Sequence, residues 1–78
     1  MTIKRTFTVV LEPAEEGGFI VHVPALPEVH TQGDTEAEAL TMAAEAIELA
    51  IEQRIEDCRP VPRDEKPEVR QVTVDAAA

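Results

Sequence analysis

The side chains best suited to chemistry in this chain of 78 residues are its carboxylates, two histidines and one cysteine. A two-metal nuclease needs carboxylates that converge on central strands, but the strand-like segments carry acids only at their ends, Glu12 and Glu68. His22 and His30 have no serine to activate, because the chain contains none, and Cys58 has no assigned base. A single cysteine also excludes an internal disulfide. The pattern therefore predicts no catalytic residue, no cofactor and no metal site.

The distribution of charge indicates a binding protein instead. Sixteen acidic and seven basic residues give a formal net charge of −9, and no Lys or Arg lies between Arg5 and Arg54. Such a surface repels nucleic-acid phosphates and anionic membranes and attracts basic partners. The alternative is that acidity only keeps a small protein soluble. The candidate partner contacts, chosen by charge alone, are Glu12, Glu15, Glu16, Glu45, Glu48 and Glu52.

Length and hydropathy predict one small domain over residues 1–78. A chain of this size buries a modest core, so association with itself or with a partner is an expected source of stability. No apolar run is long enough for a signal peptide or a membrane span, and we expect a cytoplasmic protein that binds neither membranes nor nucleic acid.

The elements that position these side chains can be read from periodicity. Residues 3–12 alternate, with Ile3, Phe7, Val9 and Leu11 on one face, and predict a first strand. Residues 13–18 form a turn in which the glycines can take positive φ, residues 19–23 return as a hairpin partner, and residues 29–32 form a short third strand. Pro24 and Pro27 end the second strand.

Residues 36–57 predict a helix, opened by Thr35 and Glu38 at capping-box spacing. The expected buried face is Ala37, Leu40, Ala44, Ile47, Ile51 and Ile55. A second apolar strip, expected to face away from the core, is Ala39, Met42, Ala46, Leu49 and, at its margin, Ala50. It suggests a homo-oligomer interface at Met42, Ala46 and Leu49, and the alternative is a run of harmless exposed alanines.

Residues 58–67 predict a proline-rich connector, 69–74 a last strand with Val72 and Val74 inward, and 75–78 a frayed tail. The expected fold is α+β with the order β-β-β-α-β: an antiparallel meander with one helix across one face. The helix is a crossover that can place the last strand parallel to the first.

The stretch 17–40 carries a resemblance to a known family. Its order is a glycine pair and an aromatic residue, then a V-P-x-L-P segment, then T-x-G-D-T-x-x-E-A. This order resembles the HicB family of bacterial antitoxins and extends over nearly the whole chain. The matching residues are Gly17, Gly18, Phe19, Val23, Pro24, Leu26, Pro27, Thr31, Gly33, Asp34, Thr35, Glu38 and Ala39.

The resemblance implies an abbreviated RNase-H-like layout and an antitoxin that binds and masks a small basic toxin. The family's usual partner, HicA, is an mRNA-cleaving protein with a double-stranded-RNA-binding-like fold. This sequence departs from the family's pattern at Glu28, where a glycine is usual, and we expect a different turn there. Many relatives append a DNA-binding domain; we expect this short form to lack one. The other hypothesis is a stand-alone homo-oligomeric module without a toxin partner.

Overall fold

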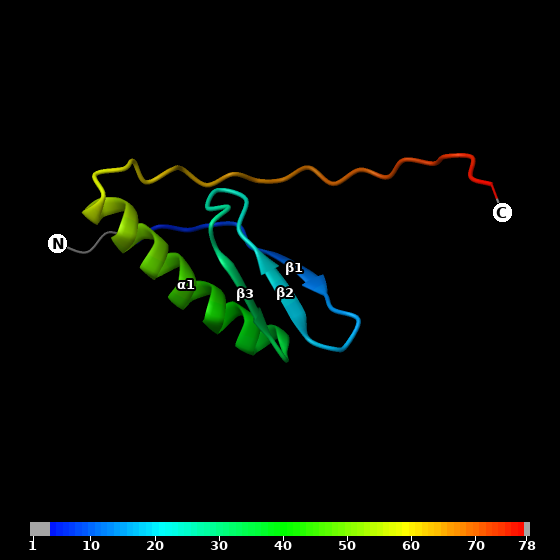
Figure 1. The fold of residues 1–78 in the computed structure, drawn as a ribbon, viewed down its shortest axis with the longest axis horizontal. Helices are drawn as coiled ribbons and strands as arrows, with labels where there is room; N and C mark the ends of the chain where they lie inside the picture. The colour runs from blue at the N-terminus through cyan, green and yellow to red at the C-terminus, as the bar shows by residue number, and fades with distance from the viewer. Residues whose placement is uncertain (1–3, 78) are drawn as a thin grey trace.

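The computed structural model describes residues 4–77 and shows a three-stranded antiparallel sheet followed by one long helix (Figure 1). The strands are β1 (Val10–Pro13), β2 (Phe19–His22) and β3 (His30–Gly33), in the sheet order β1-β2-β3. Leu11 lies opposite Val21, and Val21 lies opposite Thr31. The predicted α+β meander is confirmed. Ile3 and Ala78, the ends of the predicted first strand and tail, lie outside the described residues.

β1 is shorter than predicted, because residues 4–9 are not paired in the sheet. Phe7 and Val9 nevertheless pack beside Leu11 against the core, so the expected alternation of inward side chains is confirmed. The glycines of the β1–β2 turn have positive φ, +99° at Gly17 and +80° at Gly18. An L side chain rarely adopts these angles.

The β2–β3 loop consists of two successive turns, each closed by a backbone hydrogen bond. The Leu26 amide donates to the Val23 carbonyl, and the Val29 amide donates to the Leu26 carbonyl, both at 2.9 Å. Pro24 and Pro27 each follow the first residue of a turn, where their fixed φ is favourable. This loop provides much of the core: Val23, Ala25, Leu26 and Val29 are buried with Val21, Ala39 and Ala43.

The helix α1 (Glu36–Glu56) begins where the sequence predicts and ends one residue before the predicted end, with Asp57 as its C-cap. The Glu38 amide donates to Thr35 Oγ1 at 3.1 Å, and the Asp34 amide donates to Glu38 Oε1 at 3.3 Å. The predicted capping pair is therefore present, with the glutamate bonded to Asp34 rather than to Thr35. The bond to Thr35 satisfies the Glu38 amide, which the helix start leaves without an intrahelical partner, and the bond to Glu38 fixes the residue just before the cap.

The predicted buried face of α1 is wrong, because the face that packs on the sheet is rotated about the helix axis from the predicted one. Ala39 and Ala43, not Leu40, lie fully buried against the sheet. The reason is close approach: a Cβ on Gly33 would lie 2.6 Å from the Cα of Ala39. Only small side chains fit such a contact, and larger ones move to the flanks of the helix. Ala46, Ile47, Ala50 and Ile51 are half-buried against the core, whereas Ala37, Leu40, Ala44 and Ile55 are exposed.

The predicted last strand is not formed. Residues 58–77, which we call the arm, contain neither helix nor strand and run as an extended chain past the N-terminal segment and beyond the β1–β2 hairpin (Figure 1). Val72 and Val74, predicted to face inward, are 83% and 73% exposed. The prediction of a strand with Val72 and Val74 inward is therefore wrong: the backbone is extended, but no described strand lies beside it.

Candidate partner-binding surfaces

The first candidate surface is a hollow at the tip of the β1–β2 hairpin. The Ala14 amide donates to the Gly18 carbonyl at 3.0 Å, and the Gly17 amide donates back to the Ala14 carbonyl at 3.1 Å. This tight closure places the turn beside the end of β3. A Cβ on Gly18 would lie 2.6 Å from the Gly33 carbonyl oxygen, so the approach depends on the missing side chain.

Four carboxylates line this hollow, which has a volume of about 580 Å³: Glu12, Glu15, Glu16 and Asp34. No lysine or arginine is among the described residues around it. Phe19 and Ile20 form part of its floor, and both are half-buried. The structure thus brings together three of the predicted contact residues, Glu12, Glu15 and Glu16, and adds Asp34, which charge counting had not selected. An exposed concave acidic surface of this kind suits a lysine- or arginine-rich partner.

The other three predicted contacts lie elsewhere. Glu45, Glu48 and Glu52 are exposed on α1, apart from the buried alanine face that packs on the sheet. The six predicted contact residues therefore form two groups, one in the hairpin hollow and one on the helix.

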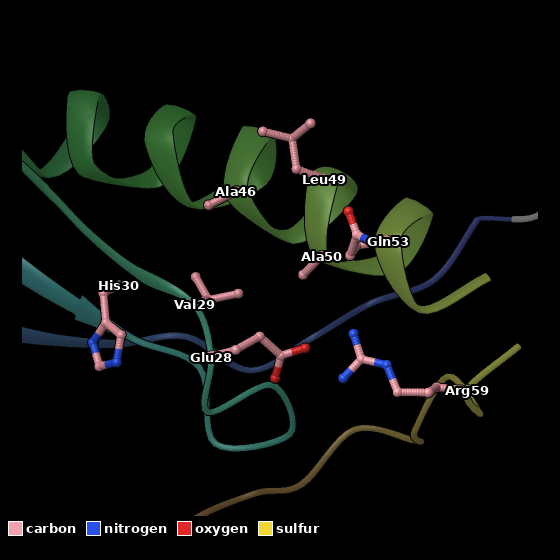
Figure 2. Close-up of a pocket in the computed structure, with 8 residues that line it drawn as sticks. All are labelled: Glu28, Val29, His30, Ala46, Leu49, Ala50, Gln53 and Arg59. Carbon is pink, nitrogen blue, oxygen red and sulfur yellow. The ribbon is translucent and has the colours of Figure 1, made fainter. Parts of the chain in front are cut away.

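A second hollow, of about 350 Å³, lies between α1 and the β2–β3 loop (Figure 2). Two of the predicted oligomer-interface residues line it, Ala46 and Leu49. Figure 2 shows Ala46 facing Val29, while Leu49 points away from the loop. Leu49 is 66% exposed and Met42 38%, whereas Ala46 is half-buried against the core. Of the second strip, Ala39 is fully buried, which contradicts its predicted place away from the core.

Glu28, where the sequence departs from the family pattern, has a specific role that sequence reasoning missed. Its carboxylate accepts two hydrogen bonds from Arg54, 2.7 Å from Nε and 2.9 Å from Nη2. Arg54 Nη1 also donates to the Pro60 carbonyl at 3.1 Å, which links the loop, the end of α1 and the arm. The hydrogen bond from Arg54 is the largest cause that lowers the pKa of Glu28, followed by a hydrogen bond from the backbone of Glu28 and by the positive charges of Arg54 and Arg59. Together they bring the pKa to about 2. The only signal in the sequence was the opposite charge of residues 28 and 54.

The two histidines lie side by side across β2 and β3, since His22 is paired in register with His30. Both side chains belong to exposed residues, and His22 Nε2 is 3.5 Å from Glu12 Oε1. This face of the sheet is the one that α1 does not cover. Over residues 4–77 no cluster of three or more metal-ligating side chains is found.

Cys58 lies just beyond the C-terminal end of α1. It is exposed and has a φ of +57°. Its amide donates to the Ile55 carbonyl at 3.1 Å, and the Arg59 amide donates to the Arg54 carbonyl at 2.8 Å. This pair of bonds is the Schellman arrangement, in which glycine usually occupies the left-handed position. Cys58 therefore ends the helix and turns the chain into the arm.

No helix in the described part of the chain combines the length and apolar character that crossing a membrane requires. Residues 6–77 match the family model described as the HicB_like antitoxin of bacterial toxin-antitoxin system. This match spans the hairpin, the helix and the whole of the arm.

Individual relatives agree with the family model. Antitoxin HicB 1 of Photorhabdus laumondii is 50% identical over 56 residues, which are 72% of this chain and 36% of that protein. A UPF0150 protein of Synechocystis sp. is 44% identical over 59 residues, 76% of this chain and 75% of that protein. Antitoxin HicB of Escherichia coli K12 is 41% identical over 56 residues, 72% of this chain and 41% of that protein. The match thus spans less than half the length of each of these two HicB proteins. Because the family model covers nearly every described residue, the chain belongs to the HicB-like antitoxin family.

Proposed function

We propose that this chain is the antitoxin of a toxin–antitoxin pair and that it binds and masks a small basic, HicA-like toxin that cleaves mRNA. Family membership supports the antitoxin role. The observation that carries the choice of a basic partner is the hairpin hollow with its four carboxylates, Glu12, Glu15, Glu16 and Asp34.

The proposed mechanism is occupancy. An RNA-cleaving protein needs a positive surface to hold phosphates, and the acidic hollow offers that surface a competing set of negative charges. While the antitoxin is bound, RNA is excluded by its bulk and by its charge. No bond is made or broken by the antitoxin, and the same charges disfavour direct nucleic-acid binding by this domain. An mRNA-cleaving target also places the proposed action in the cytoplasm.

The test uses the product of the adjacent reading frame as the toxin. Co-expression and a pull-down establish the complex, and an RNA-cleavage assay with purified toxin measures inhibition by the antitoxin. Co-purification with loss of cleavage supports the proposal. A toxin that cleaves RNA at the same rate with a molar excess of antitoxin contradicts it.

The role of the hollow is tested by the double variant Glu15→Lys, Glu16→Lys. We expect association with the toxin to slow by about tenfold at low salt, with a small change in dissociation, because exposed charges act mainly on encounter. The matched control is Glu65→Lys, Glu68→Lys, which makes the same change of charge on the arm. Glu45→Lys, Glu48→Lys tests the group on the helix.

These variants separate three outcomes when association is measured by stopped-flow at several salt concentrations. Slowing by the hairpin variant alone assigns the contact to the hollow. Slowing by the helix variant alone moves it to α1. Equal slowing by all three, including the control, means that net charge and not the hollow attracts the toxin.

A second candidate function is a homo-oligomeric module without a toxin. The exposure of Met42 and Leu49 favours it, because large apolar side chains on one helix are a common feature of subunit contacts. Under this alternative the interface is Met42, Ala46 and Leu49, and the chain leaves RNA cleavage by the neighbouring gene product unchanged.

A further inference from the structure

The arm carries apolar side chains that its own chain leaves uncovered. All residues from 65 to 77 are exposed, and Val69, Val72 and Val74 are 81%, 83% and 73% exposed. The segment 69–74 is rich in β-branched residues, which favour a strand. At about 3.3 Å per residue, an extended segment from 65 to 77 reaches roughly 40 Å. The arm is therefore long enough to lie on another molecule.

Thr8 and Asp64 fix where the arm passes the segment that precedes β1. The Thr8 amide donates to Asp64 Oδ1 at 2.6 Å, and the Thr8 hydroxyl donates to Asp64 Oδ2 at 2.7 Å. The two segments run in the same direction at this point (Figure 1). These bonds also hold the pKa of Asp64 below its usual value. The Thr8 amide has the larger effect and the Thr8 hydroxyl the smaller one.

That contact sets a register which keeps the valines away from their own β1. With Asp64 beside Thr8 and equal rise per residue, Val69 is level with Pro13, the last residue of β1. Val72 and Val74 are then level with the hairpin turn, where there is no strand to pair with. Within one chain the segment 69–74 can join β1 only if the Thr8–Asp64 contact breaks and the arm shifts by several residues.

The outer edge of β1 is the complementary surface. β1 is an edge strand, and no described strand pairs with its outer side. Such an edge presents backbone donors and acceptors to an added strand. The segment 69–74 carries one charged side chain, Arg70, and no acid, while Glu12, Glu15 and Glu16 lie at the end of β1 and in the turn that follows. Arg70 Nη2 lies 3.2 Å from Glu68 Oε2 in an exposed contact that it can exchange for these carboxylates when the segment pairs.

We propose that residues 69–74 of one copy add as a strand to the outer edge of β1 in a second copy, each copy giving its arm to the other. The Thr8–Asp64 contact stays intact and directs the arm outward. The exchange supplies in the dimer the fourth strand that one chain lacks. It uses a surface different from the Met42, Ala46 and Leu49 strip, and it does not depend on a toxin.

Sedimentation equilibrium of the purified full chain gives the first test. We expect a dimer, and we expect Val72→Asp, Val74→Asp to weaken dimerisation by at least about tenfold, because charge on an edge strand opposes pairing. The matched control Met42→Asp, Leu49→Asp should leave the dimerisation constant unchanged. Both pairs lie on exposed positions, and far-UV circular dichroism verifies that each variant is folded. A wild-type chain that stays monomeric up to about 1 mM, or an arm variant that dimerises like the wild type, overturns the proposal.

Disulfide trapping distinguishes exchange between copies from pairing within one chain. In a Cys58→Ser background, one tagged chain carries Thr73→Cys and a second, differently tagged chain carries Glu12→Cys. Under mild oxidation we expect the two tags to become linked in one species. A chain that carries both substitutions should likewise form linked dimers. If this chain instead forms the disulfide within one monomer at every dilution, the arm pairs with its own β1. That result contradicts the proposed exchange between copies.

Discussion

Val21 in β2 and Val72 in the arm show how differently one residue type behaves in two regions of this molecule. Val21 is fully buried, whereas Val72 is 83% exposed. Both lie in extended segments, yet only Val21 has strands on both sides and a helix across its face. The comparison teaches that β-branched residues in an extended backbone become a strand only where a neighbouring strand is available to satisfy the backbone.

The largest expected effect sharpens this comparison directly. Leu26 is fully buried in the β2–β3 loop, and Leu26→Ala should lower the free energy of unfolding by about 2–5 kcal/mol, since it leaves a cavity in a small core. Val72→Ala, in a dilute sample of monomers, should change it by less than about 0.5 kcal/mol. Urea unfolding measures both. A comparable loss at Val72 under monomeric conditions would show that the arm packs on its own body.

A smaller effect on stability is expected where the end of α1 meets the arm. Here Glu28→Gln removes the carboxylate that accepts two hydrogen bonds from Arg54. The pKa of Glu28 in the folded chain is about 2, against an ordinary value of 4.5. A lowered pKa stabilises the folded chain at any pH above the ordinary pKa of the group. This contribution is lost as the pH falls toward 2. We therefore expect the variant to unfold a few degrees below the wild type at pH 7, with the difference shrinking between pH 4.5 and 2.

Thermal unfolding followed by circular dichroism over this pH range provides the measurement. The control is Glu52→Gln, which lies on the helix that carries Arg54 but outside the Glu28–Arg54 contact. The effect is modest because Glu28 is 38% exposed and water screens the pair. A difference between Glu28→Gln and wild type that persists unchanged to pH 2 would mean that packing of the side chain, and not its charge, is responsible.

The smallest expected effect concerns the residue where the body turns into the arm. Cys58 holds a left-handed φ of +57° in a position that glycine occupies without strain. Cys58→Gly should raise the free energy of unfolding by up to about 1 kcal/mol, because relief of strain exceeds the entropy that glycine adds to the unfolded chain. Cys58→Ala, which keeps the strain, is the control. Equal stability of the glycine and alanine variants would contradict this interpretation.

Much of the fold could be predicted from sequence because its signals are local. The hairpin glycines, the two prolines after β2 and the Thr35–Glu38 pair act over a few residues, and each has its predicted effect. The buried face of α1 could not be predicted in this way. Periodicity indicates an apolar side but not how closely the helix approaches the sheet, and this closeness is why Ala39 and Ala43 are buried instead of Leu40.

The candidate site was predictable in part for the same reason. Glu12, Glu15 and Glu16 are close in sequence and therefore meet at one hairpin, whereas Asp34 joins them only because β3 pairs with β2. The Glu28–Arg54 contact spans 26 positions and is set by the packing of a loop on a helix end. Whether residues 69–74 form a strand depends on a neighbouring strand with which they can pair. Sequence periodicity does not show whether such a strand is present.

Arg54 has a consequence for how the arm points. Its planar guanidinium is fixed on one side by the two Glu28 oxygens and on the other by the Pro60 carbonyl. A flexible ammonium cannot reproduce this fork, so Arg54→Lys would keep the charge and lose the fixed angle. In the wild-type chain these contacts hold the start of the arm in one direction relative to the helix and the β2–β3 loop.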